Sequence, residues 1–490
     1  MIEAAPMRMK VVRGLVWLLT GQWIGKLVSV ASRIALSRIL RPYDFGVLAL
    51  AESYIGVFGV MSNWGIDQVL IRHKGEDQRV FAAGNTLRLG SALVCFVLLF
   101  ALAPVWAGTD PAVVRVSRVL GLNLLILGFA FLPTVRLRRE MRFGRLTSFQ
   151  VVNAVVCAGV SLSLAVAGFG FWSLVWGGMA GVVCYTVGLA VMEPGAFTFS
   201  FRLSDFREVL GFSLYMFLSS LLIYLINNAD DWVVGAVCGL GELGFYWAAF
   251  FWGNRVVIEL VWAMVDVLYP ALAALRDSPD FETKALAALR YVSAIVFPIY
   301  AAFLGVIPAF VNVFLGPQWG PVIPMLYLWA LYGVIRSVEN WVGLVFTAKG
   351  RMRFMAISAG IFILVGAAPM WFMTQRWRGV GMTMAFLGTS VFIHAFHLGY
   401  LHFRLGIRLK DVLGHYLPLL GIAGGAGAVA WGAGRLIGWA GVTALVGQTF
   451  ITMAVYAGLV RWGMRDIWDG FGRILREAAG RPSSEGAKTG

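Results

Sequence analysis

The sequence predicts an all-α polytopic membrane protein with about fourteen transmembrane helices. Of its 490 residues, 59% are hydrophobic and only 13% are charged, whereas a soluble domain carries about 25% charged residues. The apolar residues form blocks of roughly twenty, the length that a helix needs to cross ~30 Å of hydrocarbon. The alternation at every second residue that is typical of barrel strands is absent. The spanning segments are therefore expected to be helices.

Each span is assigned to one apolar block, and the connections between blocks are short. The longest connection, about 257–287, is expected to continue the eighth helix as an amphipathic stretch before Pro270. No connection is long enough to hold a separate domain of ordinary size. The predicted spans are 13–37, 44–65, 86–107, 116–135, 148–168, 171–192, 208–229, 232–256, 288–313, 322–347, 353–374, 379–402, 412–436 and 439–460.

The distribution of basic residues orients these spans, because cytoplasmic loops are enriched in Lys and Arg. Most of the 40 Lys and Arg residues fall in one set of alternate segments, which includes both termini. Both ends are therefore predicted to be cytoplasmic, and the first apolar block is expected to be a span and not a cleaved signal peptide. The other set of loops holds only Arg38, Arg41, Arg115, Arg376, Arg378 and Arg435.

Several kinds of partner and cofactor are not expected. The net charge of +15 does not predict nucleic-acid binding, because the basic residues lie in short loops between apolar blocks. The cysteines Cys95, Cys157, Cys184 and Cys238 lie inside apolar stretches without a CxxC pair. His394 and His397 are three residues apart, which alone does not indicate a metal site. No metal, disulfide or organic cofactor is expected.

The chain also contains a predicted internal duplication. Residues 37–51 lie 198 positions before residues 235–249, and without a gap Gly46 falls on Gly244 and Ala51 on Ala249. Six spans separate the copies, so both copies face the same way, as in parallel-repeat transporters. The predicted domains are an N-lobe at 1–200 (spans 1–6), a C-lobe at 201–408 (spans 7–12), spans 13–14 at 409–462, and a cytoplasmic tail at 463–490.

Several segments resemble polysaccharide-export flippases. The turn Arg38-Ile-Leu-Arg-Pro-Tyr-Asp-Phe-Gly46 is similar to the family's RxLxPxDFG turn after the first span. Further similar segments follow in order: Asn228-Ala-Asp-Asp231 with Gly239-Leu-Gly-Glu-Leu-Gly-Phe-Tyr246, Leu268-Tyr-Pro-Ala-Leu272, Leu315-Gly-Pro-Gln-Trp319 and Ala348-Lys-Gly-Arg351. The chain thus resembles the Wzx-type and teichuronic-acid-exporter-type members of the multidrug/oligosaccharidyl-lipid/polysaccharide superfamily.

This resemblance implies a flippase and not an enzyme. Members of the family are taken to turn undecaprenyl-pyrophosphate-linked oligosaccharides from the cytoplasmic to the periplasmic leaflet, using two six-helix lobes and usually two more helices. By analogy we expect alternating access by rocking of the lobes, coupled to H⁺ or Na⁺, in the bacterial cytoplasmic (inner) membrane. The expected partners are membrane lipids, the lipid-linked glycan and other polysaccharide-assembly proteins.

A polar stripe on the first span holds the candidate substrate-binding residues. Gln22, Lys26, Ser29 and Arg33 recur at helical spacing and share one face. A pyrophosphate that leaves water must be paired with fixed cations, so Lys26 and Arg33 are predicted to hold it inside a cavity. The alternative is a salt bridge, or snorkelling of these side chains to the interface.

Acidic residues are the candidate ion-coupling groups. We expect Glu52, Asp230, Asp231 and Glu259 to respond to the coupling ion or to line the cavity. Alternatively, Asp230 and Asp231 lie in a turn and cap the next helix, and Arg255 with Glu259 forms a structural ion pair at i, i+4. An Arg336–Glu339 pair within the tenth span is a further structural reading. The other cavity candidates are Asn227, Arg255, Arg336 and Glu339.

Two other functions compete with the flippase. A multidrug or metabolite antiporter of the same superfamily would share the helices and the duplication, but Lys26 and Arg33 at membrane depth disfavour a cationic drug. A membrane-integral glycan polymerase usually needs a large periplasmic loop, and the predicted outside loops are short.

Overall fold

The computed structural model describes residues 23–72, 78–106, 110–194 and 198–469. The contacts divide the chain into two compact units, Met1–Trp247 (unit 1) and Ala248–Gly490 (unit 2). This boundary follows the contacts, whereas the predicted lobes at 1–200 and 201–408 follow the sequence repeat. The lobe boundaries stay a prediction.

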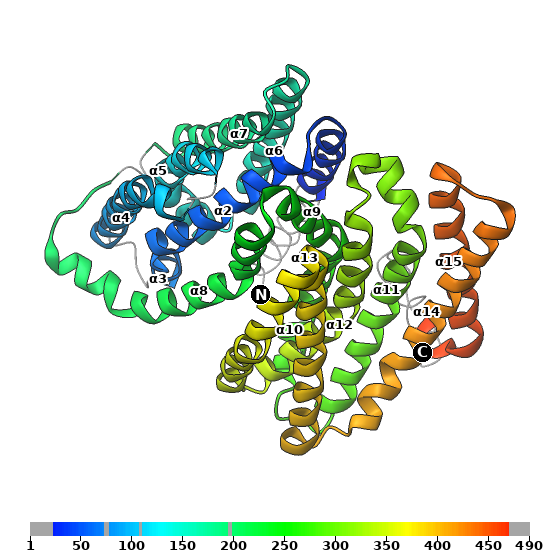
Figure 1. The fold of residues 1–490 in the computed structure, drawn as a ribbon. Coiled ribbons are helices and arrows are strands. Elements are labelled where there is room, and N and C mark those ends of the chain that lie inside the picture. Colours follow the sequence, from blue (N-terminus) through cyan, green and yellow to red (C-terminus); the bar gives the residue numbers. More distant parts are fainter. Residues whose placement is uncertain (1–22, 73–77, 107–109, 195–197, 470–490) are drawn as a thin grey trace, which may run out of the picture. The chain divides into compact units, whose positions relative to one another are not determined.

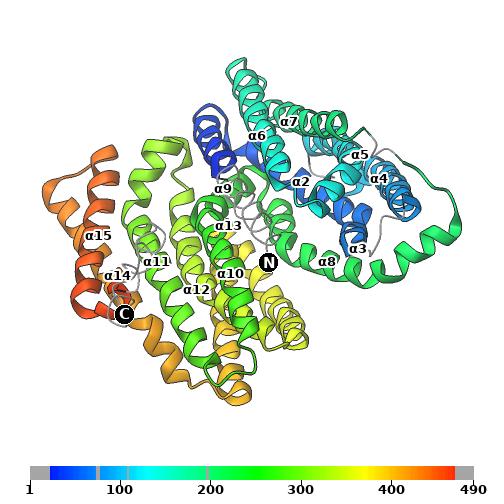
Figure 2. The same ribbon diagram turned by 180° about the vertical axis from the view of Figure 1, so that it is seen from behind.

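Unit 1 is built from antiparallel helices, drawn in blue to green in Figures 1 and 2. Residues 23–39 form the first described helix. Helices α6 and α7 pack tightly, because a Cβ on Gly177 would lie 1.8 Å from the Ser161 hydroxyl oxygen. The remaining helices are α2 (Pro42–Asn63), α3 (Ile66–Arg72), α4 (Gln78–Trp106), α5 (Pro111–Arg139), α6 (Phe143–Val166), α7 (Phe171–Met192), α8 (Leu203–Cys238) and α9 (Leu240–Phe250), which reaches into unit 2.

Local capping explains where the helices of unit 1 begin and end. Pro42 occupies the first turn of α2, and the Asp44 carboxylate accepts a hydrogen bond from the Arg41 backbone N–H at 2.8 Å. Asp110 caps α5 through the Ala112 backbone N–H, also at 2.8 Å. Helix α8 ends at Gly239, whose φ of 84° favours glycine.

The contacts between loops agree with the predicted alternation of the spans in unit 1. Loops of one predicted side contact each other, since the Tyr43 hydroxyl donates to Asp110 at 2.5 Å. Segments of the other predicted side also contact each other. Arg142 lies 3.6 Å from Glu193, and the Asn85 amide donates to the Thr198 carbonyl at 3.1 Å. The fold therefore separates the two sets of loops as the charge pattern predicted.

Unit 2 has a tightly packed core around α11 and α12. The fully buried Trp341 indole donates to the Ala285 carbonyl at 2.7 Å. Helices α14 and α15, orange to red in Figure 1, run beside α11. The elements are the π-helical turn η2 (Phe251–Arg255), α10 (Val256–Ala274), α11 (Phe281–Phe310), the π turn η3 (Val311–Leu315), the 3-10 turn η4 (Pro317–Trp319), α12 (Val322–Ala348), α13 (Met352–Leu405), α14 (Leu409–Ile437) and α15 (Gly441–Gly463).

The helices of the described residues account for the predicted spans. Within the part of the chain that the structure describes, twelve segments are long and apolar enough to cross a membrane. The 54-residue α13 holds two of the predicted spans, because non-helical backbone at Trp377 and Arg378 separates its halves. Residues 23–39 are the described part of the predicted first span, whose beginning at 13 lies outside the described residues. The all-α polytopic fold is confirmed, as is the continuation of the eighth helix, which reaches Ala274.

One predicted boundary is wrong. The predicted seventh span ends at 229 and the eighth begins at 232, and one alternative places Asp230 and Asp231 in a turn between them, but α8 continues as helix to Cys238. Adjacent carboxylates suggested a turn because they are costly in a spanning helix. Here the Tyr246 hydroxyl donates to Asp230 at 2.6 Å and offsets part of that cost. The capping role proposed for the two aspartates is therefore also wrong.

The two copies of the predicted repeat meet in a reciprocal contact inside unit 1. A Cβ on Gly46 would lie 1.8 Å from the Leu240 carbonyl oxygen, and a Cβ on Gly244 would lie 1.8 Å from the Pro42 carbonyl oxygen. The shift of 198 residues maps Pro42 on Leu240 and Gly46 on Gly244. Contacts between equivalent residues are what a two-fold axis at this crossing produces. The repeat beyond this crossing stays a prediction.

Candidate functional site

Arg33 lies inside unit 1. Its side chain is partly buried, its Nη1 atom is fully buried, and its guanidinium carbon lies 4.5 Å from the centre of the Trp247 ring. A guanidinium over an indole face gains cation–π stabilisation that grows as water is excluded. Of the two cations predicted for the first span, this one points into the protein.

The rest of the predicted polar stripe has different surroundings. Lys26 is partly buried, and its ammonium lies 5.2 Å from the ring of Trp23, an exposed residue of the same helix. Ser29 is exposed and its hydroxyl donates to the Gly25 carbonyl at 2.9 Å. Gln22 lies outside the described residues. The structure thus does not bring Lys26 and Arg33 to one common partner in the contacts described here.

Glu52 on α2 acts electrostatically on a neighbour of Arg33 and on an aspartate of α8. The Glu52 and Asp230 charges both act on Asp231, so these three carboxylates are within interaction range of one another. The sulfur of Cys157 on α6 is within range of both Arg33 and Glu52, which places the cation and this carboxylate around one point of unit 1. Arg33 and Glu52 thus share Cys157 as a neighbour, and Glu52 also acts on Asp231. We call Arg33, Glu52, Asp230 and Asp231, all of them predicted site residues, the unit 1 charge cluster.

Aromatic hydrogen bonds hold α8 against α2 beside this cluster. The Tyr224 hydroxyl donates to the Ser53 carbonyl at 2.9 Å, and the Trp232 indole donates to the Ser53 hydroxyl at 2.9 Å. A Cβ on Gly56 would lie 2.0 Å from the Tyr224 hydroxyl. The absence of a side chain at Gly56 therefore allows this close approach of α8, whereas a Cβ on Gly59 would meet only Leu124, at 3.9 Å.

Sequence reasoning missed the aromatic residues of this site. Tyr246 and Trp247 supply the hydroxyl and the ring that contact Asp230 and Arg33, and Tyr224 donates to the Ser53 carbonyl next to Glu52. Aromatics make up 14% of the chain, so their number carries no positional signal. The predicted candidate Asn227 is exposed, and its amide donates to the Ile223 carbonyl of its own helix at 2.9 Å.

The predicted residues of unit 2 form separate local contacts. Arg255 and Glu259 lie 3.8 Å apart at i, i+4, which confirms the ion pair expected from their spacing. Arg336 is exposed, and its carbonyl accepts from the Asn340 amide at 2.7 Å. Arg336 does not provide the expected partner of Glu339.

Glu339 instead binds two histidines of α13. The Nδ1 atoms of His394 and His397 lie 2.5 and 2.6 Å from its two carboxylate oxygens. The Arg336–Glu339 pair was expected because it lies within one helix, whereas the real partners are 55 and 58 residues away. The three-residue spacing of the histidines was the only sequence signal, and it did not identify the carboxylate.

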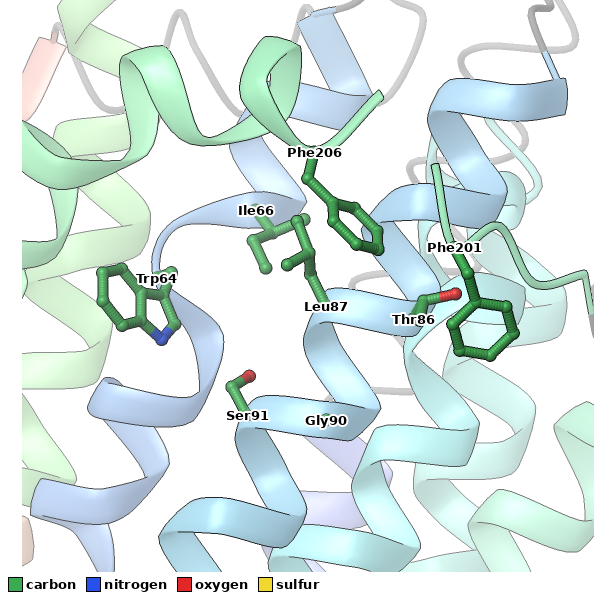
Figure 3. A pocket seen from close by; sticks show the side chains of 8 residues that line it. All are labelled: Trp64, Ile66, Thr86, Leu87, Gly90, Ser91, Phe201 and Phe206. Atoms are coloured by element: carbon green, nitrogen blue, oxygen red, sulfur yellow. The ribbon is translucent and has the colours of Figure 1, made fainter. Parts of the chain in front are cut away.

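A cavity of unit 1 lies apart from these residues. It has a volume of about 410 Å³, and Figure 3 shows its lining side chains. Its polar side chains are Thr86 and Ser91, and none of the predicted site residues contributes to it. Such a lining offers no cation for a phosphate. The full lining is Trp64, Ile66, Thr86, Leu87, Gly90, Ser91, Phe201 and Phe206.

Comparisons with known proteins identify relatives over most of the chain. A family model described as polysaccharide biosynthesis protein matches residues 35–324. The chain is 24% identical over 403 residues to the lipopolysaccharide biosynthesis protein WzxC of Escherichia coli K12, covering 78% of each chain. It is 22% identical over 316 residues to the teichuronic acid biosynthesis protein TuaB of Bacillus subtilis 168, covering 63% of this chain and 65% of that one. It is 26% identical over 305 residues to the succinoglycan biosynthesis transport protein ExoT of Rhizobium meliloti 1021, covering 60% of each.

Solved structures show the same fold. The lipid II flippase MurJ, in an inward closed conformation, matches with a TM-score of 0.73 and 12% identity, over 92% of this chain and 99% of that chain. An inward-facing multidrug resistance MATE transporter of the MOP superfamily matches with a TM-score of 0.62 and 16% identity, over 81% of this chain and 99% of that chain. At such identities the likeness concerns the fold alone.

Proposed function

The chain belongs to the polysaccharide biosynthesis protein family, and we propose that it is a flippase that moves a polyprenyl-pyrophosphate-linked oligosaccharide across a membrane of a bacterial cell envelope. Its relatives are named for the synthesis or transport of surface polysaccharides. One of the structures with its fold is a lipid II flippase. Fold and family thus support transport of a lipid-linked glycan.

The observation that carries this proposal is the partly buried side chain of Arg33, whose Nη1 atom is buried. An ionisable group within a spanning segment is costly and commonly faces a partner or a pathway. A pyrophosphate that leaves water needs such a fixed cation, and a guanidinium can offer two parallel N–H donors to its oxygens. The Trp247 ring fixes the guanidinium without neutralising its charge.

Acids beside the cation give this site a means of release. Glu52, which shares a neighbour with Arg33 and acts on Asp231, disfavours an anionic substrate at Arg33, because like charges repel. Binding of H⁺ or Na⁺ to these acids reduces their negative charge and so weakens their repulsion of the substrate. Release of the ion restores this repulsion. The coupling ion therefore controls how strongly Arg33 holds the pyrophosphate.

The remaining parts of the proposal concern location and movement. The charge alternation favours the cytoplasmic (inner) membrane with both termini in the cytoplasm. Transport proceeds by alternating access, in which the two units change their relative orientation. The protein acts without catalysis of its own, beside the other proteins that assemble the polysaccharide.

Substitution of Arg33 tests the proposal. In cells that depend on this protein for a surface polysaccharide, Arg33→Ala should reduce export about tenfold or more, because a hydrogen bond to a charged group contributes about 1.5–3 kcal/mol. The matched control is Arg118→Ala on α5. Its guanidinium also lies 4.5 Å from a ring, that of the exposed Phe100, and its loss should leave export near the wild-type rate.

Two outcomes would contradict the proposal. If Arg33→Ala exports normally at wild-type protein levels, Arg33 does not handle the substrate. If cells lacking the protein accumulate no lipid-linked glycan and instead become sensitive to cationic drugs, the antiporter reading replaces the flippase.

A further inference from the structure

The buried group of Glu339, His394 and His397 in unit 2 has a chemistry that the proposed function has not used. Glu339 on α12 is 9% exposed, and its carboxylate oxygens each face a histidine Nδ1 from α13. The side chains of His394 and His397 are 15% and 12% exposed. We call these three residues the unit 2 histidine cluster.

Aromatic rings enclose this cluster. The rings of Phe346 and Phe354 pack on His397, with centroids 5.5 and 5.6 Å from the imidazole. The Tyr416 hydroxyl of α14 lies 3.4 Å from His394 Nε2. His397 Nε2 is buried, and no other described residue makes a hydrogen bond to it. A basic nitrogen is therefore held in an apolar surrounding with its lone pair unused.

The hydrogen-bond pattern fixes where protons lie. A carboxylate oxygen only accepts, so both Nδ1 atoms must carry a proton. With neutral histidines, the two Nε2 atoms are acceptors and the cluster has a charge of −1. One added proton on Nε2 makes the charge zero, and a second makes it +1. Because net charge is costly in a poorly hydrated interior, the neutral, singly protonated cluster is the favoured state.

Other charged groups on the neighbouring helices have partners of their own. Glu259 on α10 pairs with Arg255, and Arg290 on α11 pairs with Asp466. Arg336 on α12 is exposed. The groups whose charge acts on Glu339 in the described structure are the two histidines, and Tyr416 faces them from α14. Proton uptake by the cluster is thus not compensated by a nearby fixed charge.

The geometry of Glu339, His394 and His397 favours proton binding over metal binding. Both histidines direct Nδ1 at the carboxylate instead of at a shared point that an ion could occupy. Within the described ranges, no group of three or more His, Cys, Asp and Glu residues has an arrangement that could hold a metal ion.

We propose that Glu339, His394 and His397 form a proton-binding site that takes up one proton from water on Nε2 of a histidine and couples its binding and release to transport. This inference rests on the proposed flippase function and deepens it, because it selects H⁺ as a coupling ion and places a site for it in unit 2. Histidine is the side chain that proteins commonly use to bind and release protons, and here two of them are held on one carboxylate with a buried Nε2. The cluster links α12 to the half of α13 after Trp377 and Arg378, and a change in its charge alters the attraction between these helices.

A titration that needs no substrate tests the site itself. The probe is the purified full-length protein with ¹⁵N-labelled histidine, observed by NMR from about pH 5 to 8. We expect Nδ1 of His394 and His397 to stay protonated throughout, while one Nε2 titrates. Failure of both Nε2 atoms to titrate in this range would overturn the proposal, whatever the protein transports.

Proteoliposomes test the coupling. His397→Asn keeps an amide donor near the position of Nδ1 but cannot bind a proton, and His402→Asn changes an exposed histidine of the same helix as a control. With the membrane potential clamped, we expect an imposed pH gradient to change wild-type and His402→Asn flipping about tenfold, and His397→Asn flipping less than twofold. The double variant His394→Asn/His397→Asn should behave like His397→Asn.

The outcomes separate this inference from the proposed function. Wild-type flipping that ignores the pH gradient, or a His397→Asn variant that responds like the wild type, would overturn the proton site and leave the flippase intact. Absence of wild-type flipping of any lipid-linked glycan would refute the proposed function, and the NMR titration would still decide whether the cluster binds a proton.

Discussion

The two units both hold charge at membrane depth, but they stabilise it in different ways. In unit 1, Arg33 is a permanent cation that stacks on the Trp247 ring, and the exposed Glu52 shares Cys157 with it as a neighbour. In unit 2, the Glu339 carboxylate is enclosed, and its partners are the Nδ1 atoms of two histidines. A fixed charge can hold a ligand, whereas a titratable group can change state. This difference is the basis on which we propose substrate binding in unit 1 and a proton site in unit 2.

The largest effect is expected at the glycine crossing that positions unit 1. Gly244→Ala places a Cβ 1.8 Å from the Pro42 carbonyl oxygen, so α2 and α9 must separate. Overpacking of this kind costs about 1–3 kcal/mol or more, and we expect a clear loss of thermal stability and of export. The control is Gly241→Ala, where a Cβ meets nothing within 4 Å. Equal melting temperatures for the two variants would contradict the described crossing.

A smaller but clear effect is expected at Tyr246. Tyr246→Phe removes the 2.6 Å hydrogen bond to Asp230 and leaves that carboxylate oxygen without its donor. Loss of one partner of a poorly solvated charged group costs about 1–3 kcal/mol. We expect lower thermal stability in purified protein, with Tyr269→Phe on an exposed residue as the control. Unchanged stability would mean that Asp230 is well solvated.

Gly56 should show an intermediate effect. In Gly56→Ala the new Cβ lies 2.0 Å from the Tyr224 hydroxyl and displaces its hydrogen bond to Ser53. A neutral hydrogen bond contributes about 0.5–1.5 kcal/mol, so we expect a loss of that order in the free energy of unfolding. Gly59→Ala, one helical turn later, makes only an ordinary contact and should be neutral. If Gly59→Ala lost more stability than Gly56→Ala, α8 would not pack on α2 in this way.

The smallest effect is expected at the exposed ion pair of unit 2. Glu259→Gln breaks its pairing with Arg255, whose side chain is 56% exposed, and such i, i+4 pairs contribute about 0.3–0.5 kcal/mol. Export and its response to pH should change less than twofold. A large loss of the pH response would move the coupling site from the histidine cluster to Glu259, as the sequence first suggested.

The sequence predicts much of the fold because hydrophobicity and charge act locally. Blocks of apolar residues mark the spans, and the interruption at Arg376 and Arg378 marks the turn that divides α13. The end of α8 was misplaced because local reasoning sees two adjacent aspartates but not Tyr246, which binds one of them from the next helix.

The candidate sites also differ in whether a local sequence signal reveals them. Arg33 was predicted because an arginine within a spanning helix is visible in the sequence. The histidine cluster was not, because Glu339 and its partners are brought together only by the packing of α12 on α13. Helical spacing shows which residues share a face, but not which face of another helix they meet.

The affinity of the purified protein for a polyprenyl pyrophosphate tests the central claim most directly, because it needs neither transport nor a particular sugar. Wild-type protein and Arg118→Gln should bind with similar affinity, and Arg33→Gln should bind about tenfold more weakly or worse, since each tenfold corresponds to about 1.4 kcal/mol. If Arg33→Gln binds as tightly as the wild type, the pyrophosphate is held elsewhere and the role assigned to unit 1 is wrong.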